Sequence, residues 1–521
     1  MTFLTNRFYS LIGFEIHVKL ATKSKIFSKA SALPARPTNT QVSLLDMSVP
    51  GSLPYLNRSC LEAGIRMAFG LHCSINKSSF LERKHYFYPD SPSGYQITQQ
   101  RKPYAFNGFL EYPLIAKRDR LQAKYVPDKK EIIKKCRIDR IQLEHDTGRS
   151  IHDEHDQRTL IDLNRSGTGL LEIVTHPDIR TSVEGESFLR ELNRLLIAYN
   201  ICEQSGLETP VRVDANVSVH EKNTKPTGFR VEIKNISSFV DVKNAVDFEL
   251  KRQERMLLNA QPLCSETRTY DSNKRQTIHI RRKEEKIDYC FMPEPNLPPL
   301  YLYDDNDIMP TNNPNYINID EIHRQLPLSP FKQREQMQIK YKDFLTTEHI
   351  FDLLRYEMMD YFNELMALVE PSDINRQHLI LEVLLDDVKR MTWGGEKMNK
   401  FVKIIKPELF LHIIDYLERR IITRFSLYEI LLISYKNKQP DKSLEQILND
   451  NNLVGIVDNE KLVPMCQQVI DDNPKLAEKY KTNPKKAIEQ LRLAICKQYP
   501  GRIHNDLVID IFTDILNKQS S

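Results

Sequence analysis

The sequence lacks the short motifs that identify many common enzymes. It contains neither the GxxxxGK[ST] phosphate-binding loop nor the GxGxxG dinucleotide fingerprint, and the HExxH and GxSxG patterns are also missing. No stretch reaches the roughly 18 uncharged apolar residues that a membrane-spanning helix needs. Any enzymatic chemistry must therefore come from a less common arrangement of side chains.

Cysteine is scarce and scattered. The eight cysteines among 521 residues form no CxxC or zinc-knuckle spacing, which favours free, mostly buried thiols in a reducing compartment. Charge is nearly balanced, and a net charge of +4 permits binding to a polyanion without arguing for it. With 40% hydrophobic and 28% charged residues, the composition is typical of a soluble globular protein of two to four domains.

The first 300 residues or so and the remainder of the chain differ in their sequence patterns. In about the first 300 residues, alternating runs at 212–220 and 229–236 predict an antiparallel hairpin, whereas 183–199 and 240–258 have helical periodicity. Strands and helices mixed without strict βαβ order indicate an α+β domain. The Pro- and Asn-rich stretch 291–330 predicts a linker or extended arm.

Nearly everything after this stretch reads as helical. Ser329 followed by Pro330 predicts a helix start, because proline is favoured at the first helical position. Ser443 with Gln446 and Ser426 with Glu429 fit capping boxes, which predict two more helix starts (443–446 and 426–429).

Several strand-like segments carry an acidic side chain. Glu15 and His17 lie two residues apart in "GFEIHVKL" and so project from one face of a strand, while Glu144, Glu172, Asp214 and Glu232 stand in other alternating or apolar segments. A lone acid on a strand usually faces solvent, so the wet side of a surface strand is one interpretation. The other is a Mg²⁺ or Mn²⁺ site, since converging carboxylates repel one another unless a cation neutralises them.

The segment "ERKHYFYPDSPSGYQITQ", residues 82–99, has little helical or strand periodicity. It is either a surface loop whose tyrosines pack on the core or a positioned loop. In the second case it would bring Arg83 and Lys84 to an anionic ligand such as a phosphate or carboxylate.

A family resemblance joins these segments. "GFEIHVKLATKSKIFS", "PGSLPYLN", "ERKHYFYPDSPSGYQITQ", "LEHDTGRSIHD", "DLNRSGTGLLEIVTHPDIR", "VRVDANVSV", "RVEIKNISSF" and "ETRTYDSNKRQTIHIRRKEEKIDYCFMPEPNLPPL" occur in this order. They closely resemble the B subunit of the glutamyl-tRNA(Gln)/aspartyl-tRNA(Asn) amidotransferase. The match covers about the first 300 residues, and the helical remainder matches more loosely.

The resemblance implies an α+β cradle domain similar to glutamine synthetase and guanido kinases, whose antiparallel sheet lines the site, followed by an all-α helical and tail region. MgATP would phosphorylate the γ-carboxylate of glutamate esterified to tRNA(Gln), and ammonia would then displace the phosphate. A separate A subunit, an amidase, would release that ammonia from glutamine and pass it through a tunnel. A small third subunit would brace the pair.

The resemblance also assigns roles to residues of this chain. The metal site would contain Glu15, His17 and Glu144. The same catalytic pocket would be lined by Glu172, Asp214 and Glu232, and the catalytic residue Lys84 would lie where the ammonia tunnel opens. The substrate-binding loop would be shaped by Arg83, Tyr86, Asp90 and Tyr95. The predicted domains are a catalytic cradle over 1–295, a linker and helical domain over 296–410, and a tRNA-binding helical tail over 411–521.

The sequence departs from the family pattern at several positions. His145 stands where the family usually has an acid, and Cys290 where arginine is usual. The acids assigned to the metal pocket are all retained, so activity is not put in doubt.

Cellular location and substrate follow less directly. No acid precedes Glu15, so the start of the chain is either the stub of an organellar transit peptide or an ordinary lead-in to a strand. Together with the departures and the basic balance, it predicts a form in the mitochondrial matrix. Amidation of Asp-tRNA(Asn) by the same pocket and a non-catalytic tRNA-binding scaffold are the alternatives.

Overall fold

The computed structural model divides the chain into two compact units, Met1–Gln333 and Arg334–Ser521. It describes residues 7–33, 36–114, 132–153, 155–203, 211–225, 228–282, 289–308, 316–342, 344–356, 358–392, 396–436 and 443–520. Of the acid-free start of the chain, residues 7–14 lie in the described part and residues 1–6 lie outside it.

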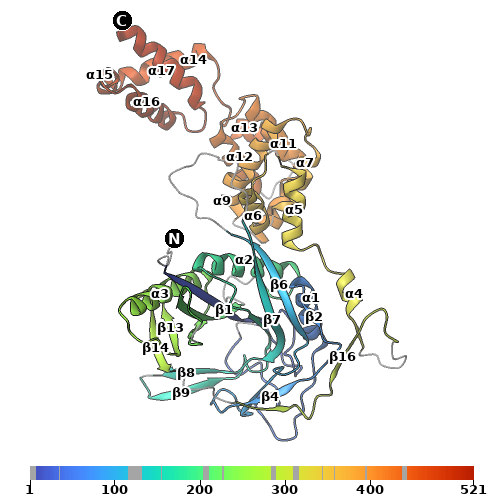
Figure 1. Cartoon of the computed structure of the whole chain (residues 1–521). Coiled ribbons are helices and arrows are strands. Elements are labelled where there is room, and N and C mark those ends of the chain that lie inside the picture. Colours follow the sequence, from blue (N-terminus) through green and yellow to red (C-terminus); the bar gives the residue numbers. More distant parts are fainter. Residues whose placement is uncertain are drawn as a thin grey trace. The chain divides into compact units, whose positions relative to one another are not determined.

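A large, mostly antiparallel sheet organises the first unit (Figure 1). Among the described residues it has nine strands. In spatial order they are β14 (Gln276–Arg282), β13 (Glu266–Asp271), β12 (Val231–Ile236), β11 (Val211–Glu221), β1 (Phe8–Lys19), β10 (Gly169–Thr175), β7 (Ile133–His145), β6 (Ala105–Pro113) and β2 (Ser74–Ile75). Strands β12 and β13 pair in parallel. The predicted hairpin is confirmed, since β11 and β12 pair antiparallel.

Alternation along the strands separates the two faces of the sheet. In β1, Phe14, Ile16 and Val18 are almost fully buried, because they belong to one cluster with side chains of the helices on that face. The ring centroids of Phe14 and Phe188 of α2 (Ser182–Ala198) lie 6.2 Å apart. Glu15 and His17 point to the opposite face. The helices thus seal one face and leave the acids on the other.

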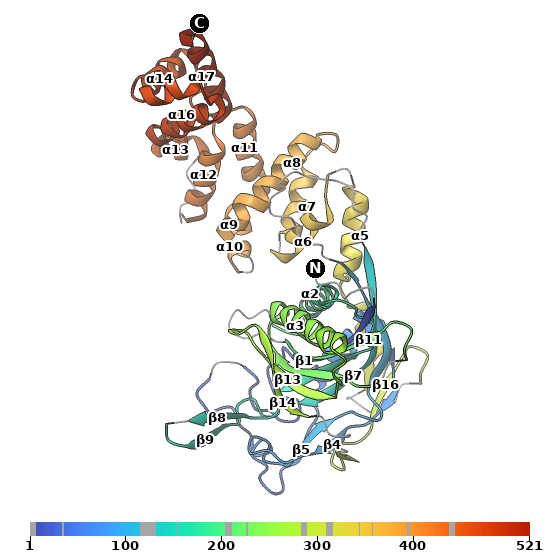
Figure 2. The ribbon, with the colours of Figure 1, turned by 60° about the vertical axis from the view of Figure 1, so that its left-hand side comes forward.

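Helices α1 (Arg58–Gly70), α2 and α3 (Phe239–Leu258) form this covering layer, and α2 and α3 agree with the predicted helices. Thr181 starts α2, because its side chain accepts a hydrogen bond from the backbone N–H of Glu184. In Figure 2, α2 and α3 lie on one side of the sheet, and β4 (Glu82–His85), β5 (Tyr95–Thr98), β8 (Arg149–Asp153) and β9 (Arg158–Asp162) lie on the other.

The stretch predicted to be a linker or an extended arm is an extended arm of the first unit. It forms the short strands β15 (Cys290–Pro293), β16 (Leu300–Tyr303) and β17 (Ile317–Asn318) and the helix α4 (Ile319–Arg324). These strands pair with β4, with the two-residue strand β3 (Ser78–Ser79) and with each other. Residues 309–315 of the arm lie outside the described part.

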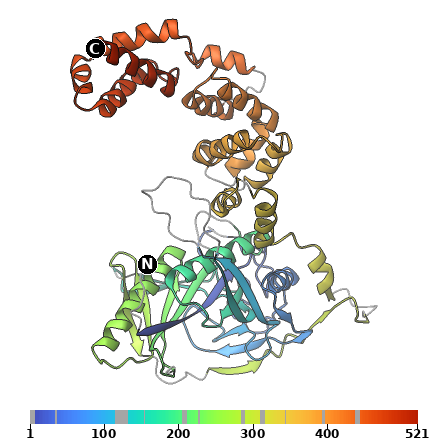
Figure 3. The same ribbon diagram turned by 45° about the horizontal axis from the view of Figure 1, so that its top comes forward.

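The second unit is helical (Figure 3). Its described elements are α5 (Pro330–Lys340), α6 (Thr347–Arg355), α7 (Met359–Ala367), α8 (Ile374–Glu382), the π-helix η1 (Val383–Val388), α9 (Lys389–Thr392), α10 (Glu396–Ile404), α11 (Pro407–Glu418), α12 (Arg424–Lys436), α13 (Leu444–Asp450), α14 (Asn459–Asp471), α15 (Pro474–Tyr480), α16 (Pro484–Gln498) and α17 (Asn505–Ser520). One hydrophobic cluster runs from Met337 to Leu453 and another from Leu462 to Leu516. Among the described residues, no helix combines the length and apolar character needed to cross a membrane.

These observations confirm the predicted fold class, an α+β domain with a mostly antiparallel sheet followed by an all-helical region. Two of the three predicted helix starts are confirmed, because Ser443 caps α13 in a capping box and Pro330 opens α5. The predicted start at Ser426 is wrong, because α12 begins at Arg424 and the Ser426 backbone N–H donates to the Thr423 hydroxyl. The predicted division after residues 295 and 410 stays a prediction.

A buried ion pair gives a test of the first unit's packing. Lys25 Nζ lies 2.9 Å from Asp46 Oδ2, and their side chains are 0% and 2% exposed. Lys25→Met would leave Asp46 charged and unpaired, so we expect a loss of about 3–5 kcal/mol of stability. The double variant Lys25→Met/Asp46→Asn should lose less. Calorimetry of the full chain measures both, and a Lys25→Met protein that unfolds at the wild-type temperature would contradict this.

Candidate functional site

Acidic side chains form a row across the open face of the sheet, one strand after another. The row crosses the five neighbouring strands β12, β11, β1, β10 and β7. Its members, in that order, are Glu232, Asp214, Glu15 with His17, Glu172 and Glu144. The register creates the row, because Glu15 lies opposite Asp214 and His17 lies opposite Glu172.

A register shift in β11 helps to place Asp214. The pairing of β11 with β12 shifts between Val213 and Ala215, so Asp214 stands at an irregularity. The backbone N–H of Asn235, a residue with φ of 57°, donates a hydrogen bond of 2.8 Å to Asp214 Oδ1. Local backbone geometry thus orients this carboxylate.

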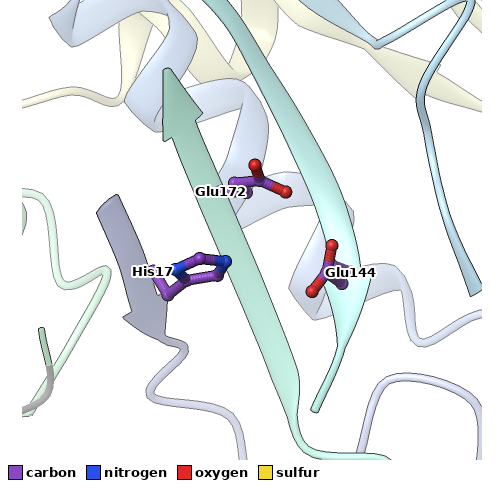
Figure 4. Close-up of side chains that lie close together, drawn as sticks. All are labelled: His17, Glu144 and Glu172. Carbon is purple, nitrogen blue, oxygen red and sulfur yellow. The ribbon is translucent and has the colours of Figure 1, made fainter. Parts of the chain in front are cut away.

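The row divides into two groups that could each hold a metal ion. His17, Glu144 and Glu172 offer ligand atoms that all lie within 4.8 Å of one another, and their side chains converge from three neighbouring strands (Figure 4). Glu15, Asp214 and Glu232 form the second group by the same measure. The predicted metal set of Glu15, His17 and Glu144 therefore spans both groups, and only His17 and Glu144 lie in one.

Both groups fit a divalent cation. Ligands bound to one Mg²⁺ at about 2.1 Å lie at most about 4.2 Å apart, so small side-chain adjustments would bring either set onto an ion. Carboxylate oxygens suit Mg²⁺ or Mn²⁺, and an imidazole in the first group is also compatible with Mn²⁺.

Burial and repulsion perturb the first group. Burial raises the pKa of Glu144 well above its usual range, and the neighbouring charge of Glu172 raises it further. Burial also works to raise the pKa of Glu172, but His17, Lys84 and the hydrogen bond from Glu144 lower it overall. Of the two carboxyl groups, Glu144 therefore binds a proton more readily than Glu172 does.

Burial and repulsion also perturb the second group. Burial raises the pKa of Glu15, and the charges of Glu172, Glu232 and Asp214 add to the effect. Lys234 partly offsets this charge, since its Nζ lies 3.7 Å from Glu232 Oε1 and 3.9 Å from Asp214 Oδ2. A cation binding here would relieve the same repulsion.

Of the predicted loop residues, Lys84 and Tyr86 lie close to the acids. The charge of Lys84 acts on both Glu144 and Glu172. Tyr86 donates a hydrogen bond of 2.8 Å to Gln96, which in turn donates to Glu144.

The other three loop residues make contacts elsewhere. Arg83 points away from Lys84, because neighbours on a strand alternate, and it forms a two-pronged ion pair of 2.6 and 2.9 Å with Glu294. Its guanidinium lies 4.2 Å from the centre of the Tyr95 ring. Asp90 accepts hydrogen bonds from Ser150 and from the backbone of Gly148.

Sequence reasoning missed the polar side chains that contact the acids. They are Gln96, Thr98, Gln142, Asn216 and Thr267. Gln142 and Asn216 stand two residues from a predicted acid on the same strand, so the alternation could have found them. Gln96 and Thr98 come from β5, and nothing in the sequence pattern indicated that β5 packs beside β7.

The chain also matches known protein families. Residues 10–306 match the family model described as the GatB/GatE catalytic domain, and residues 360–516 match the GatB domain. This chain belongs to the GatB family. The resemblance seen in the sequence is thereby confirmed, and the row of acids lies inside the matched catalytic domain.

Relatives agree along nearly the whole length. The chain is 36% identical over 495 residues to the B subunit of the mitochondrial glutamyl-tRNA(Gln) amidotransferase of Danio rerio, covering 94% of this chain and 86% of the relative. It is 36% identical over 488 residues to the corresponding mitochondrial protein of Homo sapiens, covering 93% and 84%. It is 32% identical over 517 residues to the B subunit of the aspartyl/glutamyl-tRNA(Asn/Gln) amidotransferase of Rickettsia felis, covering 98% of both chains.

His145, the departure beside Glu144, gives a pH-dependent test. Burial lowers the pKa of His145 to about 4, and its Nδ1 accepts a hydrogen bond from the Ile97 N–H. The unfolded chain binds this proton more tightly, so stability falls as pH drops from about 6.5 to about 4, by at most about 1.4 kcal/mol per pH unit. His145→Asn keeps an acceptor that does not titrate. Its unfolding temperature should fall less between pH 7 and pH 5 than that of wild type, and an equal fall would contradict the assignment.

Glu144 gives a test with the opposite sign. Its raised pKa means that the folded protein holds this proton more tightly than the unfolded chain, so the folded state is penalised as pH rises above about 4.5. In chelator-treated protein at pH 7, Glu144→Gln should raise the unfolding temperature by about 2–4 °C. The gain should shrink as pH falls toward 4.5. A variant that is less stable than wild type at pH 7 would contradict the raised pKa of Glu144.

Proposed function

We propose that this chain is the B subunit of an amidotransferase that converts Glu-tRNA(Gln) to Gln-tRNA(Gln) with ATP and Mg²⁺. Relatives that match over 90% of the chain are named as the B subunit of a glutamyl-tRNA(Gln) amidotransferase. The observation that carries the proposal is the row of five carboxylates and one imidazole across neighbouring strands, with Lys84 beside it. Phosphoryl transfer depends on positioning and charge neutralisation, and this site offers both.

The two acidic groups would each hold one Mg²⁺, the first through His17, Glu144 and Glu172 and the second through the remaining three acids. Bound Mg²⁺ supplies positive charge that offsets the negative charge of the ATP phosphates. The strands hold the ligands in place before the ions arrive, so little rearrangement is needed at the moment of reaction.

The chain's own residues would orient the reacting groups. Lys84 lies near Glu144 and Glu172 and is 5.0 Å from the centre of the Tyr289 ring, so its ammonium can meet an anionic oxygen at the edge of the first group. A glutamate carboxylate becomes an acceptor for ammonia only when phosphorylation turns one oxygen into a leaving group. Residues that exclude water around the phosphorylated glutamate would limit its hydrolysis.

The amidotransferase would work only in a complex. The relatives are named as subunits, which supports a partner, and we assign glutamine hydrolysis to a separate A subunit, with a small third subunit that braces the pair. Glu-tRNA(Gln) is the substrate we favour, because the animal relatives are named for it alone. Asp-tRNA(Asn) amidation is the second candidate, because the Rickettsia relatives are named for both tRNAs.

We place the protein in the mitochondrial matrix. The animal relatives carry the word mitochondrial in their names and reach 36% identity, against 32% for Rickettsia felis. A scaffold that only binds tRNA is disfavoured, because it would have no use for six metal-type ligands gathered against their own repulsion.

The assembled complex tests this function. With Glu144→Gln, we expect tRNA-dependent phosphate release and Gln-tRNA(Gln) formation both to fall by about 100-fold or more, because the first group loses a charged ligand. Glutamine hydrolysis by the partner should continue. Glu191→Gln is the matched control, since Glu191 is a buried acid on α2 that pairs with Arg194 at 3.0 Å. Near wild-type amidation by Glu144→Gln would overturn the proposed site.

A further inference from the structure

Buried acids outside the site share one feature. Among the described residues, each of them has a Lys or Arg partner within ion-pair distance. The pairs are Asp46–Lys25, Glu82–Arg101, Asp146–Arg212, Glu184–Lys134, Glu191–Arg194, Glu249–Arg252, Glu266–Arg268, Glu294–Arg83 and Asp387–Arg424. Such partners cancel most of the charge of a buried carboxylate.

Glu144 and Glu172 break this pattern. In the described part of the chain, no Lys or Arg lies within ion-pair distance of either carboxylate, although Glu144 is 5% exposed and Glu172 is 9% exposed. Their hydrogen-bond donors are uncharged. The Gln96 amide donates to Glu144 Oε1, and the Gln142 amide donates to Glu172 Oε2 at 2.6 Å.

Glu15, in the second group, also accepts a hydrogen bond from an uncharged amide. The Asn216 amide donates to Glu15 Oε1 at 3.1 Å. The Oδ1 atom of Asn216 is buried and has no hydrogen-bond partner among the described residues, so an unused acceptor stands beside the second group. Three acids on three strands are thus each held by a carboxamide.

We propose that Gln96, Gln142 and Asn216 are positioning residues that fix the cation-binding carboxylates through neutral hydrogen bonds and so leave their negative charge available to divalent cations. A guanidinium or ammonium donor would orient the same oxygens but would compete with the cation for their charge. A carboxamide orients them without this competition, and partners of metal ligands typically contribute about 10–100-fold to metal affinity. The inference rests on the proposed function, because it assumes that the two acidic groups bind cations.

Thr98 links the carboxylate of Glu144 to the amide of Gln142. Its hydroxyl donates to Glu144 Oε2 at 3.1 Å and accepts from the Gln142 amide at 3.2 Å. Gln96, Thr98 and Gln142 are all nearly buried, with exposed fractions of 6%, 1% and 2%. Water therefore competes little for these hydrogen bonds.

Mn²⁺ binding to the assembled complex, measured by electron paramagnetic resonance, tests the inference without any turnover. Gln142→Met keeps the shape and removes the donor, so we expect the Mn²⁺ affinity of the first group to fall about 10–100-fold. Gln142→Lys should bind Mn²⁺ at least as weakly, yet raise the unfolding temperature of chelator-treated protein, since it neutralises Glu172. A purely structural role would not give opposite changes in affinity and stability.

The matched control is Gln253→Met. Gln253 is a fully buried glutamine whose amide donates to Glu249 at 2.8 Å, but Glu249 already pairs with Arg252. This variant should lose stability and keep wild-type Mn²⁺ affinity. Asn216→Ala, at a half-buried position, tests the second group if Gln142→Met does not fold, and should weaken Mn²⁺ binding there by about 10-fold or more.

The outcomes separate the two proposals. If wild type binds no Mn²⁺, the proposed cation sites fail. If wild type binds Mn²⁺ and the folded Gln142→Met or Asn216→Ala variants bind it equally tightly, the sites stand and the positioning role is overturned.

Discussion

Repulsion among the carboxylates on one face of the sheet is the constraint on which the rest of the first unit depends. Burial makes Glu15 and Glu144 costly to ionise, and the charges of neighbouring acids add to this cost. The opposite face offsets it, because apolar side chains such as Phe14 and Ile16 pack against the covering helices. The folded sheet therefore keeps these carboxylates closer together than they would lie in the unfolded chain. This lowers stability, as functional sites commonly do.

The site has two ends with different surroundings. Around Glu144 and Glu172, amides and a threonine hydroxyl make the hydrogen bonds, and Lys84 is a cation whose charge acts on both acids. Around Asp214 and Glu232, Lys234 lies close to both acids. Lys84 thus lies near one end of the row and Lys234 near the other.

Much of this arrangement was open to prediction from the sequence, and the reasons are specific. Alternation in 13–20 placed Glu15 and His17 on one face, and the same logic identified Glu172, Asp214 and Glu232 as acids on strands. Their convergence was not predictable, because it depends on the spatial order of the strands. In that order β1 lies between β10 and β11, which are both distant from β1 in sequence. The ordered family motifs supplied the connection that spacing could not.

Other features required the structure. The Pro-rich stretch reads as a linker or an extended arm, and only the structure shows that β15 pairs with β4 and β16 with β3. Arg83 and Lys84 are indistinguishable as basic residues in one loop, yet strand pairing sends one to Glu294 and the other toward Glu144. The start of α12 was misplaced, because Ser426 fits a capping box while Thr423 makes the capping hydrogen bond.

The central claim is that the row of acids forms two cation sites on one sheet face. Anomalous diffraction from crystals of the assembled complex soaked in Mn²⁺ tests it most directly. We predict one peak among His17, Glu144 and Glu172 and a second among Glu15, Asp214 and Glu232. A well-ordered cradle domain with no peak at either place, under conditions that support amidation, would contradict it.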